Sequence, residues 1–134
     1  MPFTQRITII RTDRKKSENL NDEIRWLCNS LGLFNVRDKD SSCYRIFIEL
    51  LRSTKEAHPI SSDEIARKLS LSRGTVMHHV NKLMSSGLVI TEHSKYSLRV
   101  SNLEVLMDEI EHDLNRAFSD MKTMAKKIDK ELGL

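Results

Sequence analysis

Hydrogen-bond donors gather on one side of residues 72–82. Arg73 and Lys82 carry positive charge, and Asn81 has an amide that both donates and accepts. Side chains of these types bind phosphates and base edges: arginine pairs bidentately with guanine, and asparagine does so with adenine. The spacing predicts a surface that contacts nucleic acid, made of Ser72, Arg73, Thr75, His78, Asn81 and Lys82.

Two short helices joined by a tight turn are expected to position these side chains. Ser61 can accept a hydrogen bond from the backbone of Glu64, whose side chain can reach back, as in a capping box. The turn contains Ser70, a buried Leu71 and Ser72, which is the N-cap of the second helix. The second helix is expected to turn inward Val76, Val80 and Leu83. The pair predicts a helix–turn–helix whose second helix enters the DNA major groove.

A β-hairpin is expected to follow the helix pair. Residues 88–92 are strand-like, and residues 96–100 alternate in the same way. Helix pair and hairpin in this order predict a winged helix–turn–helix domain. The hairpin adds His93 and Lys95 at the wing tip, and Arg99 as a phosphate contact. The turn lacks Gly and Asn, so its type stays open.

Two further helices are expected before the pair. Residues 18–31 form an amphipathic helix, with Ser17 as a possible cap, Gly32 as its stop and a polar linker at residues 35–41. Its inner face is Leu20, Ile24, Leu27, Cys28 and Leu31. Residues 42–54 have only a narrow polar stripe and therefore predict the central helix of the domain. That stripe is Arg45, Glu49 and Arg52.

From Leu103 onward, apolar residues follow a heptad pattern for almost four repeats. A helix of ~28 residues is ~42 Å long, which is more than a domain of this size easily covers. We expect two copies to pair through a coiled-coil-like seam. Packing on its own domain is the alternative, because Leu106, Phe118 and Leu132 widen the stripe. The seam consists of Leu103, Met107, Ile110, Leu114, Ala117, Met121, Met124 and Ile128.

Charge is unevenly distributed along the 134 residues. Residues 1–16 hold five basic residues against one acid, and residues 66–100 hold six against one, whereas the other two segments are acidic. Positive charge in the N-terminal arm and in the second helix of the pair is typical of a nucleic-acid-binding face. Residues 1–16 are expected to be an arm or a strand, residues 17–100 the DNA-binding domain, and residues 101–134 the dimerisation helix.

Composition supports a mainly α protein with a small β-hairpin. Four Gly and two Pro leave little room for a loop-rich or all-β fold. Cys28 and Cys43 lack C-x-x-C spacing, so we expect buried thiols rather than a disulfide or a metal site. No apolar run reaches the ~20 residues that span a bilayer, and the ITII run is too short for a signal peptide. An intracellular protein is expected.

The string SRGTVMHHVNKLMSSGLV and the order of elements resemble the ArsR-like winged helix–turn–helix transcriptional regulators, archaeal members in particular. The likeness runs from about Cys43 through the helical tail. It implies that residues 72–82 read DNA, that residues 93–95 form the wing tip and that the tail dimerises. Ser70 departs from the pattern, because these motifs often have Gly at that turn position. The wing is also short.

Metal sensing, which many ArsR-like proteins perform, is not expected. The thiol pair that such sensors place near the helix pair is missing. Asp108 and His112 lie four residues apart but point away from the heptad seam, as solvated surface residues do. His78 and His79 are adjacent, so they splay by about 100° on a helix and do not chelate one ion together. We expect no metal, no cofactor and no small-molecule ligand.

These features together predict a homodimeric, sequence-specific, double-stranded DNA-binding transcriptional regulator in the cytoplasm, associated with the nucleoid. Two alternatives stay open: a weakly selective architectural DNA-binding protein, and a protein-interaction module without DNA binding. An enzyme is not expected, because no Gly-rich phosphate loop, H-E-x-x-H or G-x-S-x-G motif occurs. The N-terminal arm is open between a minor-groove contact, a strand at the dimer interface and disorder.

Overall fold

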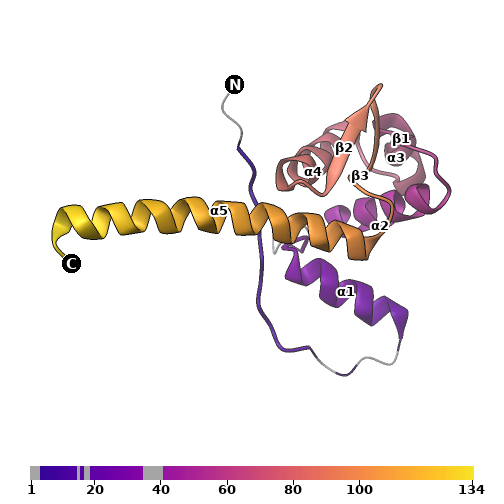
Figure 1. The fold of residues 1–134 in the computed structure, drawn as a ribbon. Coiled ribbons are helices and arrows are strands. Elements are labelled where there is room, and N and C mark those ends of the chain that lie inside the picture. Colours follow the sequence, from indigo (N-terminus) through magenta and orange to yellow (C-terminus); the bar gives the residue numbers. More distant parts are fainter. Residues whose placement is uncertain (1–3, 15, 17–18, 35–40) are drawn as a thin grey trace.

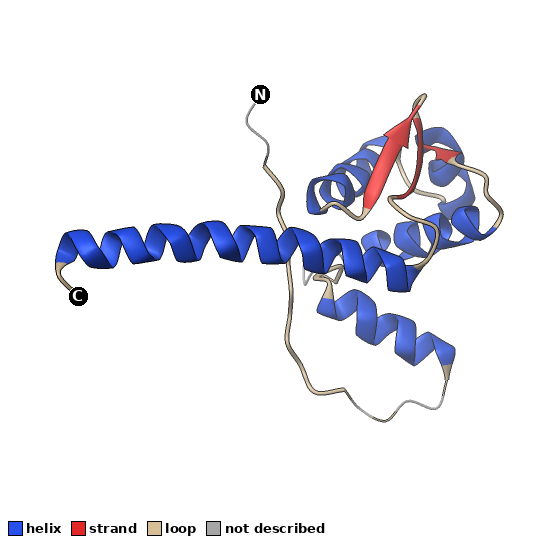
Figure 2. Ribbon diagram, in the orientation of Figure 1, coloured by secondary structure: helices blue, strands red, loops and turns tan. Residues whose placement is uncertain are grey.

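The structure, a computed structural model, describes residues 4–14, 16, 19–34 and 41–134. Within these residues the chain forms five helices and a small three-stranded sheet, which confirms the predicted fold class (Figures 1 and 2). The elements in chain order are α1 (Leu20–Ser30), α2 (Ser42–Lys55), β1 (Ile60–Ser61), α3 (Ser62–Leu69), α4 (Arg73–Ser86), β2 (Val89–Glu92), β3 (Lys95–Leu98) and α5 (Leu103–Leu132).

Helix α2 is the central helix, as its composition predicts. Ile46, Phe47 and Leu50 are fully buried, and the helix contacts α3, α4 and β3. Its expected polar stripe is wrong at Glu49, which is buried while Arg52 is exposed. Burial of a charge is costly unless the charge is paired. Glu49 accepts from Lys68 Nζ of α3 at 3.3 Å, so it ties the central helix to the first helix of the pair.

The helix pair forms as its capping residues predict. Ser61 accepts a hydrogen bond from Glu64 N at 3.2 Å, and Ser72 accepts one from Thr75 N at 3.1 Å. Ser70 lies in the left-handed region, at φ 54° and ψ 46°, which explains why Gly is frequent at this turn position. Leu71 is only half-buried rather than a buried plug, although it packs against the core.

The sheet has one strand more than the sequence indicates. Its order is β1-β3-β2, all antiparallel, with Ile60 opposite Tyr96 and Glu92 opposite Lys95. The hairpin loop consists of His93 and Ser94, both at positive φ, as two-residue type I′ loops require. Lys95 is therefore the first residue of β3 and not part of the loop.

Helix α1 begins later than expected. Its N-cap is Asn19, which accepts from Asp22 N at 2.8 Å. The expected cap Ser17 and residues 35–40 of the expected linker 35–41 lie outside the described residues. Leu20 is 70% exposed and not part of the inner face. Gly32, at φ 72°, follows the last turn, as predicted. The helix packs against the core through Cys28 and its neighbours.

Residues 4–14 form an extended arm, and no strand is formed by these residues within the single chain. Arg6 N donates to Ser85 O at 3.0 Å, and Ile10 N donates to Ser30 O at 2.8 Å. The arm thus crosses α5 and connects the end of α4 to the end of α1 (Figure 1). Gly87, at φ 85°, permits this path, because a Cβ there would overlap the Gln5 side chain.

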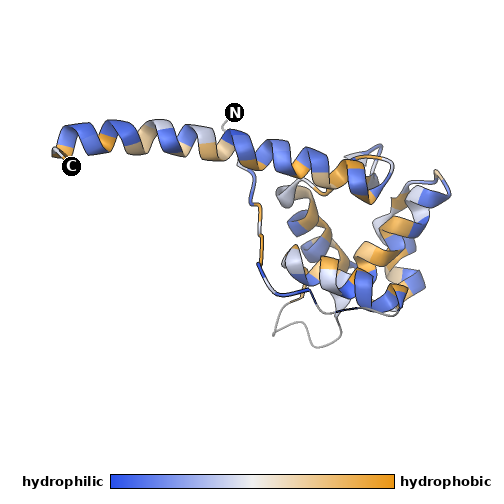
Figure 3. Ribbon diagram, turned by 60° about the horizontal axis from the view of Figure 1, so that its bottom comes forward, coloured by the Kyte–Doolittle hydropathy of each residue, from blue (hydrophilic) through white to orange (hydrophobic). Residues whose placement is uncertain are grey.

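Helix α5 belongs to the domain for less than half of its length. Leu106, Ile110 and Asp113 are buried, but every residue from 115 to 134 is exposed. The C-terminal half projects away from the rest of the molecule (Figure 1). Apolar residues recur along this projecting part among hydrophilic ones (Figure 3).

Candidate nucleic-acid interface

Helix α4 turns one face inward and leaves the other in solvent, as predicted. Val76, Val80 and Leu83 have no exposed surface, and they fix the rotation of the helix. The opposite face carries the predicted contact residues, which are exposed except for the half-buried Thr75. The exposed residues are Ser72, Arg73, His78, Asn81 and Lys82.

Ser72 and Thr75 make hydrogen bonds to each other at the start of α4. The Ser72 hydroxyl accepts from Thr75 N and donates to Thr75 Oγ1 at 2.8 Å. These contacts stabilise the first turn, because an N-cap satisfies a backbone donor that has no partner within the helix. Both residues therefore position the helix. The Thr75 hydroxyl accepts in this contact and keeps its own O–H to donate, beside the donors of the longer side chains.

Arg73 has an acidic neighbour that the sequence does not indicate. Its Nε lies 3.6 Å from Asp63 Oδ1 of α3, and both side chains are largely exposed. An ion pair this exposed is weak and screened by salt. Arg73 is thus held near the first turn of α4 but stays accessible to a stronger anion such as a phosphate or to a base edge.

Lys82 lies at the other end of the face. Its Nζ donates to Gly32 O at 3.5 Å, so the side chain leans toward the loop after α1. The contact is long, and the residue is exposed. Lys82 is therefore available to a phosphate that passes beside α4, whereas His78 and Asn81 occupy the middle of the exposed face.

The wing carries two further predicted contact residues, His93 and Lys95, and both are exposed. His93 is exposed in the loop, with its Nε2 3.9 Å from Glu92 Oε1. Lys95 is exposed at the start of β3, where it pairs with Glu92 of β2 on one side and with Ser61 of β1 on the other. The strands thus fix the Lys95 backbone on both sides, and only its side chain is free to move.

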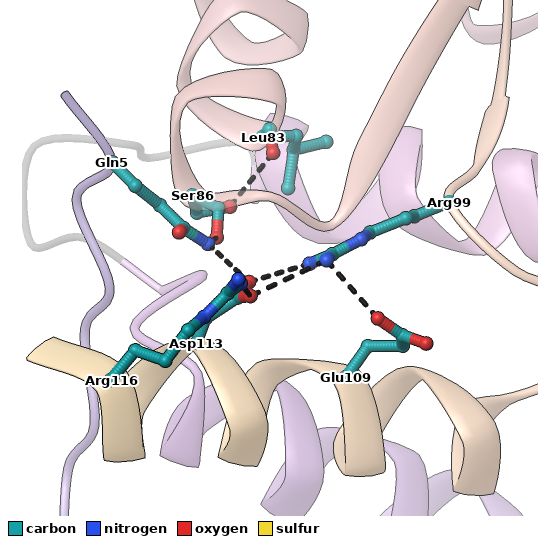
Figure 4. A network of polar contacts seen from close by, with 7 residues as sticks. All are labelled: Gln5, Leu83, Ser86, Arg99, Glu109, Asp113 and Arg116. Atoms are coloured by element: carbon teal, nitrogen blue, oxygen red, sulfur yellow. Dashed lines mark hydrogen bonds and ion pairs between the residues drawn. The ribbon is translucent and has the colours of Figure 1, made fainter. Parts of the chain in front are cut away.

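Arg99, the third residue expected to contact phosphate, has partners within the protein (Figure 4). Its Nη1 donates to Asp113 Oδ2 of α5 at 2.6 Å and its Nη2 donates to Glu109 Oε2 of α5 at 3.2 Å. The hydrogen bond from Arg99 lowers the pKa of Asp113 and raises the pKa of Arg99. Both groups are therefore charged at neutral pH. With its guanidinium bound by two carboxylates, Arg99 is less available to a phosphate than the exposed Lys82 and Lys95.

Asp113 is the centre of this network. Gln5 Nε2 of the arm donates to its Oδ2 at 2.8 Å and to Ser86 O at 3.0 Å, and Arg116 Nη2 donates to Oδ1 at 2.7 Å. The network joins the arm, the C-terminal end of α4, the base of the wing and α5 (Figure 4). It fixes α4 relative to α5. In the sequence, the sign of this network is an acidic residue, Asp113, directly before the seam residue Leu114.

The predicted dimerisation residues divide into two groups. Ile110 is buried in the protein's own domain, Leu103 and Met107 pack against its core, and Leu114 is half-buried. The remaining four are exposed: Ala117, Met121, Met124 and Ile128. This second group is therefore the part of the predicted seam that is most available to another molecule.

Comparison with known families agrees with the domain type. Residues 48–90 match a family model described as winged helix-turn-helix DNA-binding, which spans most of α2, the helix pair and the start of the wing. Searches of curated proteins and of solved structures gave no match. The fold is therefore a winged helix–turn–helix domain, and residues 48–90 of it are similar to a DNA-binding family.

In the part of the chain that the structure describes, no group of three or more His, Cys, Asp or Glu side chains has the placement to hold a metal ion. Asp108 and His112 are both exposed. None of the described helices combines the length and the apolar character needed to cross a bilayer.

Proposed function

We propose that this protein is a sequence-specific, double-stranded DNA-binding transcriptional regulator that acts as a homodimer. The observation that carries the proposal is the exposed polar face of α4, which has Arg73 at one end and Lys82 at the other. In helix–turn–helix proteins this face of the second helix enters the major groove. The ArsR-like resemblance supports the same role, and such a regulator works in the cytoplasm at the nucleoid.

Two kinds of contact are assigned within this surface. Arg73 and Asn81 are the base readers, because their side chains offer paired hydrogen bonds to guanine and adenine, worth ~1–3 kcal/mol of discrimination each. Lys82 and Lys95 bind phosphate, because a lysine ammonium is a point charge that does not distinguish sequences. His78 and His93 are supplementary donors beside these two groups.

Dimerisation is assigned to the projecting part of α5. Phe118, Met121, Met124 and Ile128 are each about half exposed, and they follow one another on one side of the helix. Apolar surface of this extent on a solvated helix favours burial against another molecule. A symmetric dimer presents two reading helices, which match an inverted repeat in DNA.

Selection of duplexes from a random pool, with mass measurement of the bound complex, tests the proposal. We expect an inverted repeat and two protein chains per duplex. Binding that selects no sequence, with affinity of only ~10⁻⁴–10⁻⁶ M at physiological salt, would favour an architectural DNA-coating protein. No duplex binding even at low salt would favour a protein-interaction module.

A further inference from the structure

We infer that two copies of α5 pair antiparallel, with Met121 of each copy against Met124 of the other and Ala117 against Ile128. The inference rests on the proposed homodimer and specifies its direction and register. Three observations on the projecting segment agree on this one arrangement: the length of helix left uncovered, the sizes of the facing side chains and the charges at the edge of the seam.

The exposed face is an a/d/e stripe rather than the narrow a/d seam of a parallel two-stranded coil. Positions e of the heptad frame hold Phe118, Ala125 and Leu132. Phe118 is 48% exposed and Leu132 is 68% exposed. In a parallel pair the e edge lies beside the g edge of the partner, where charged residues usually pair. Here Asp120 and Lys127 at g would face Ala125 and Leu132, and no ion pair would form.

The length of the helix fits the antiparallel arrangement. In the stated register, Glu131 of one copy lies level with Leu114 of the other. Leu114 is the last half-buried residue beside its own domain, and α5 ends at Leu132. Each helix therefore ends where the other winged domain begins. If the two helices overlapped by seven more residues, the end of each would collide with the other domain. If they overlapped by seven fewer, Ala117 and Phe118 would stay uncovered.

Side-chain sizes are complementary in this register. Ile128 of one copy meets Ala117 of the other in the outer layers, and Phe118 meets Ala125 at the e edge, so a large residue faces a small one at both places. Met121 and Met124 face each other at the centre, where flexible side chains fill irregular space. Alternation of large and small residues across facing positions gives the density of a protein interior.

Charges at the edge of the seam select the same register. The g edges of two antiparallel helices lie side by side, so Asp120 of each copy faces Lys127 of the other, and the pair occurs twice. A shift of one heptad would place Asp120 against its own counterpart, or Lys127 against its own. Both shifts bring like charges together, which is destabilising.

The arrangement separates the two DNA-binding domains. Their Asp113 anchors would lie ~28 Å apart along the helix axis, from the 1.5 Å rise per residue. Two reading helices on successive turns of B-DNA are ~34 Å apart. A parallel pair would bring the anchors within the ~8–10 Å between packed helix axes, side by side. The antiparallel dimer thus separates its domains along the helix axis, whereas a parallel pair would hold them side by side.

Cross-linking of mixed cysteine variants tests the direction. We expect a short bismaleimide to join Ala117→Cys chains to Ile128→Cys chains in a mixture, but to join neither variant to itself, because like positions lie ~16 Å apart. The native thiols Cys28 and Cys43 are buried, and wild-type protein therefore gives the background level of cross-linking. Self-linking of each variant without mixed product would establish a parallel pair and overturn the inference.

A charge exchange tests the register. Asp120→Lys should raise the dimer dissociation constant about tenfold in sedimentation, because two attractions become repulsions, and adding Lys127→Asp should restore it. Failure of the double variant to recover would contradict this register. Both residues are exposed, so the domain should keep its helical circular dichroism. Wild-type protein that sediments as a monomer would refute the homodimer itself, whereas a dimer that self-links refutes only the antiparallel pairing.

Discussion

The carboxylate of Asp113 should be the largest single polar contribution to the stability of the domain. Its side chain is 3% exposed and accepts hydrogen bonds from Arg99, Gln5 and Arg116. Asp113→Asn keeps the shape but removes the charge, which leaves the Arg99 guanidinium without its closest counter-ion. Hydrogen bonds to charged groups contribute ~1.5–3 kcal/mol, and Arg116 is too exposed to add much. We expect a loss of about 2–3 kcal/mol in the free energy of unfolding.

The loss should depend on pH in one direction. The hydrogen bond from Arg99 holds the pKa of Asp113 below its usual value of 3.8, so the folded state favours the charged carboxylate. A depressed pKa contributes stability that is fully present above the unfolded value and is lost as pH falls through the folded one. The difference between wild type and Asp113→Asn should therefore be constant from pH 6 to 8, and shrink below about pH 4.

Denaturant unfolding of wild type and Asp113→Asn at several pH values measures this difference in free energy. In thermal unfolding at pH 7, the melting temperature of Asp113→Asn should be about 5–10 °C below that of wild type. Asp108→Asn is the matched control, because Asp108 lies on the same helix and is exposed. We expect no more than ~0.5 kcal/mol from the control. Equal stability of Asp113→Asn and wild type at pH 7, or a difference that grows in acid, would show that the network does not hold α5 to the domain.

Three further outcomes are expected. Glu49→Gln should cost ~1–2 kcal/mol of unfolding free energy, because it removes the buried charge that binds Lys68; an unchanged denaturation midpoint would contradict this. Cys28, whose pKa burial raises to about 12, should react with iodoacetamide only on unfolding, and fast labelling of folded protein by mass spectrometry would show otherwise. Lys95→Ala should weaken binding to all duplexes alike and reduce the salt dependence by about one ion, as fluorescence anisotropy at several salt concentrations would report; a loss confined to one sequence would assign Lys95 to base reading.

Local patterns predicted the helix pair because its determinants are close in sequence. The caps Ser61 and Ser72 act on backbone donors three residues away, and Val76, Val80 and Leu83 mark one face by spacing alone. The same local logic identified α2 as central. The heptad pattern also predicted that α5 is long, because the pattern continues for more residues than the domain can cover.

Features that depend on distant partners could not be read in this way. Arg99 was assigned to DNA from its charge, but Asp113, 14 residues further on, binds it. Glu49 looked like a solvated residue until Lys68, 19 residues later, was placed beside it. β1 has only two residues, too few for alternation to be visible. Each of these outcomes was decided by tertiary contact.

The ratio of cognate to random duplex affinity for Arg73→Ala is the measurement that bears most on DNA reading by α4. Lys122→Ala is the control, since it removes one exposed positive charge from the projecting part of α5. We expect Arg73→Ala to lower cognate affinity by about 5- to 150-fold, that is ~1–3 kcal/mol, with a much smaller loss on random DNA. Equal losses on cognate and random DNA, or no loss beyond that of Lys122→Ala, would contradict base reading by this face.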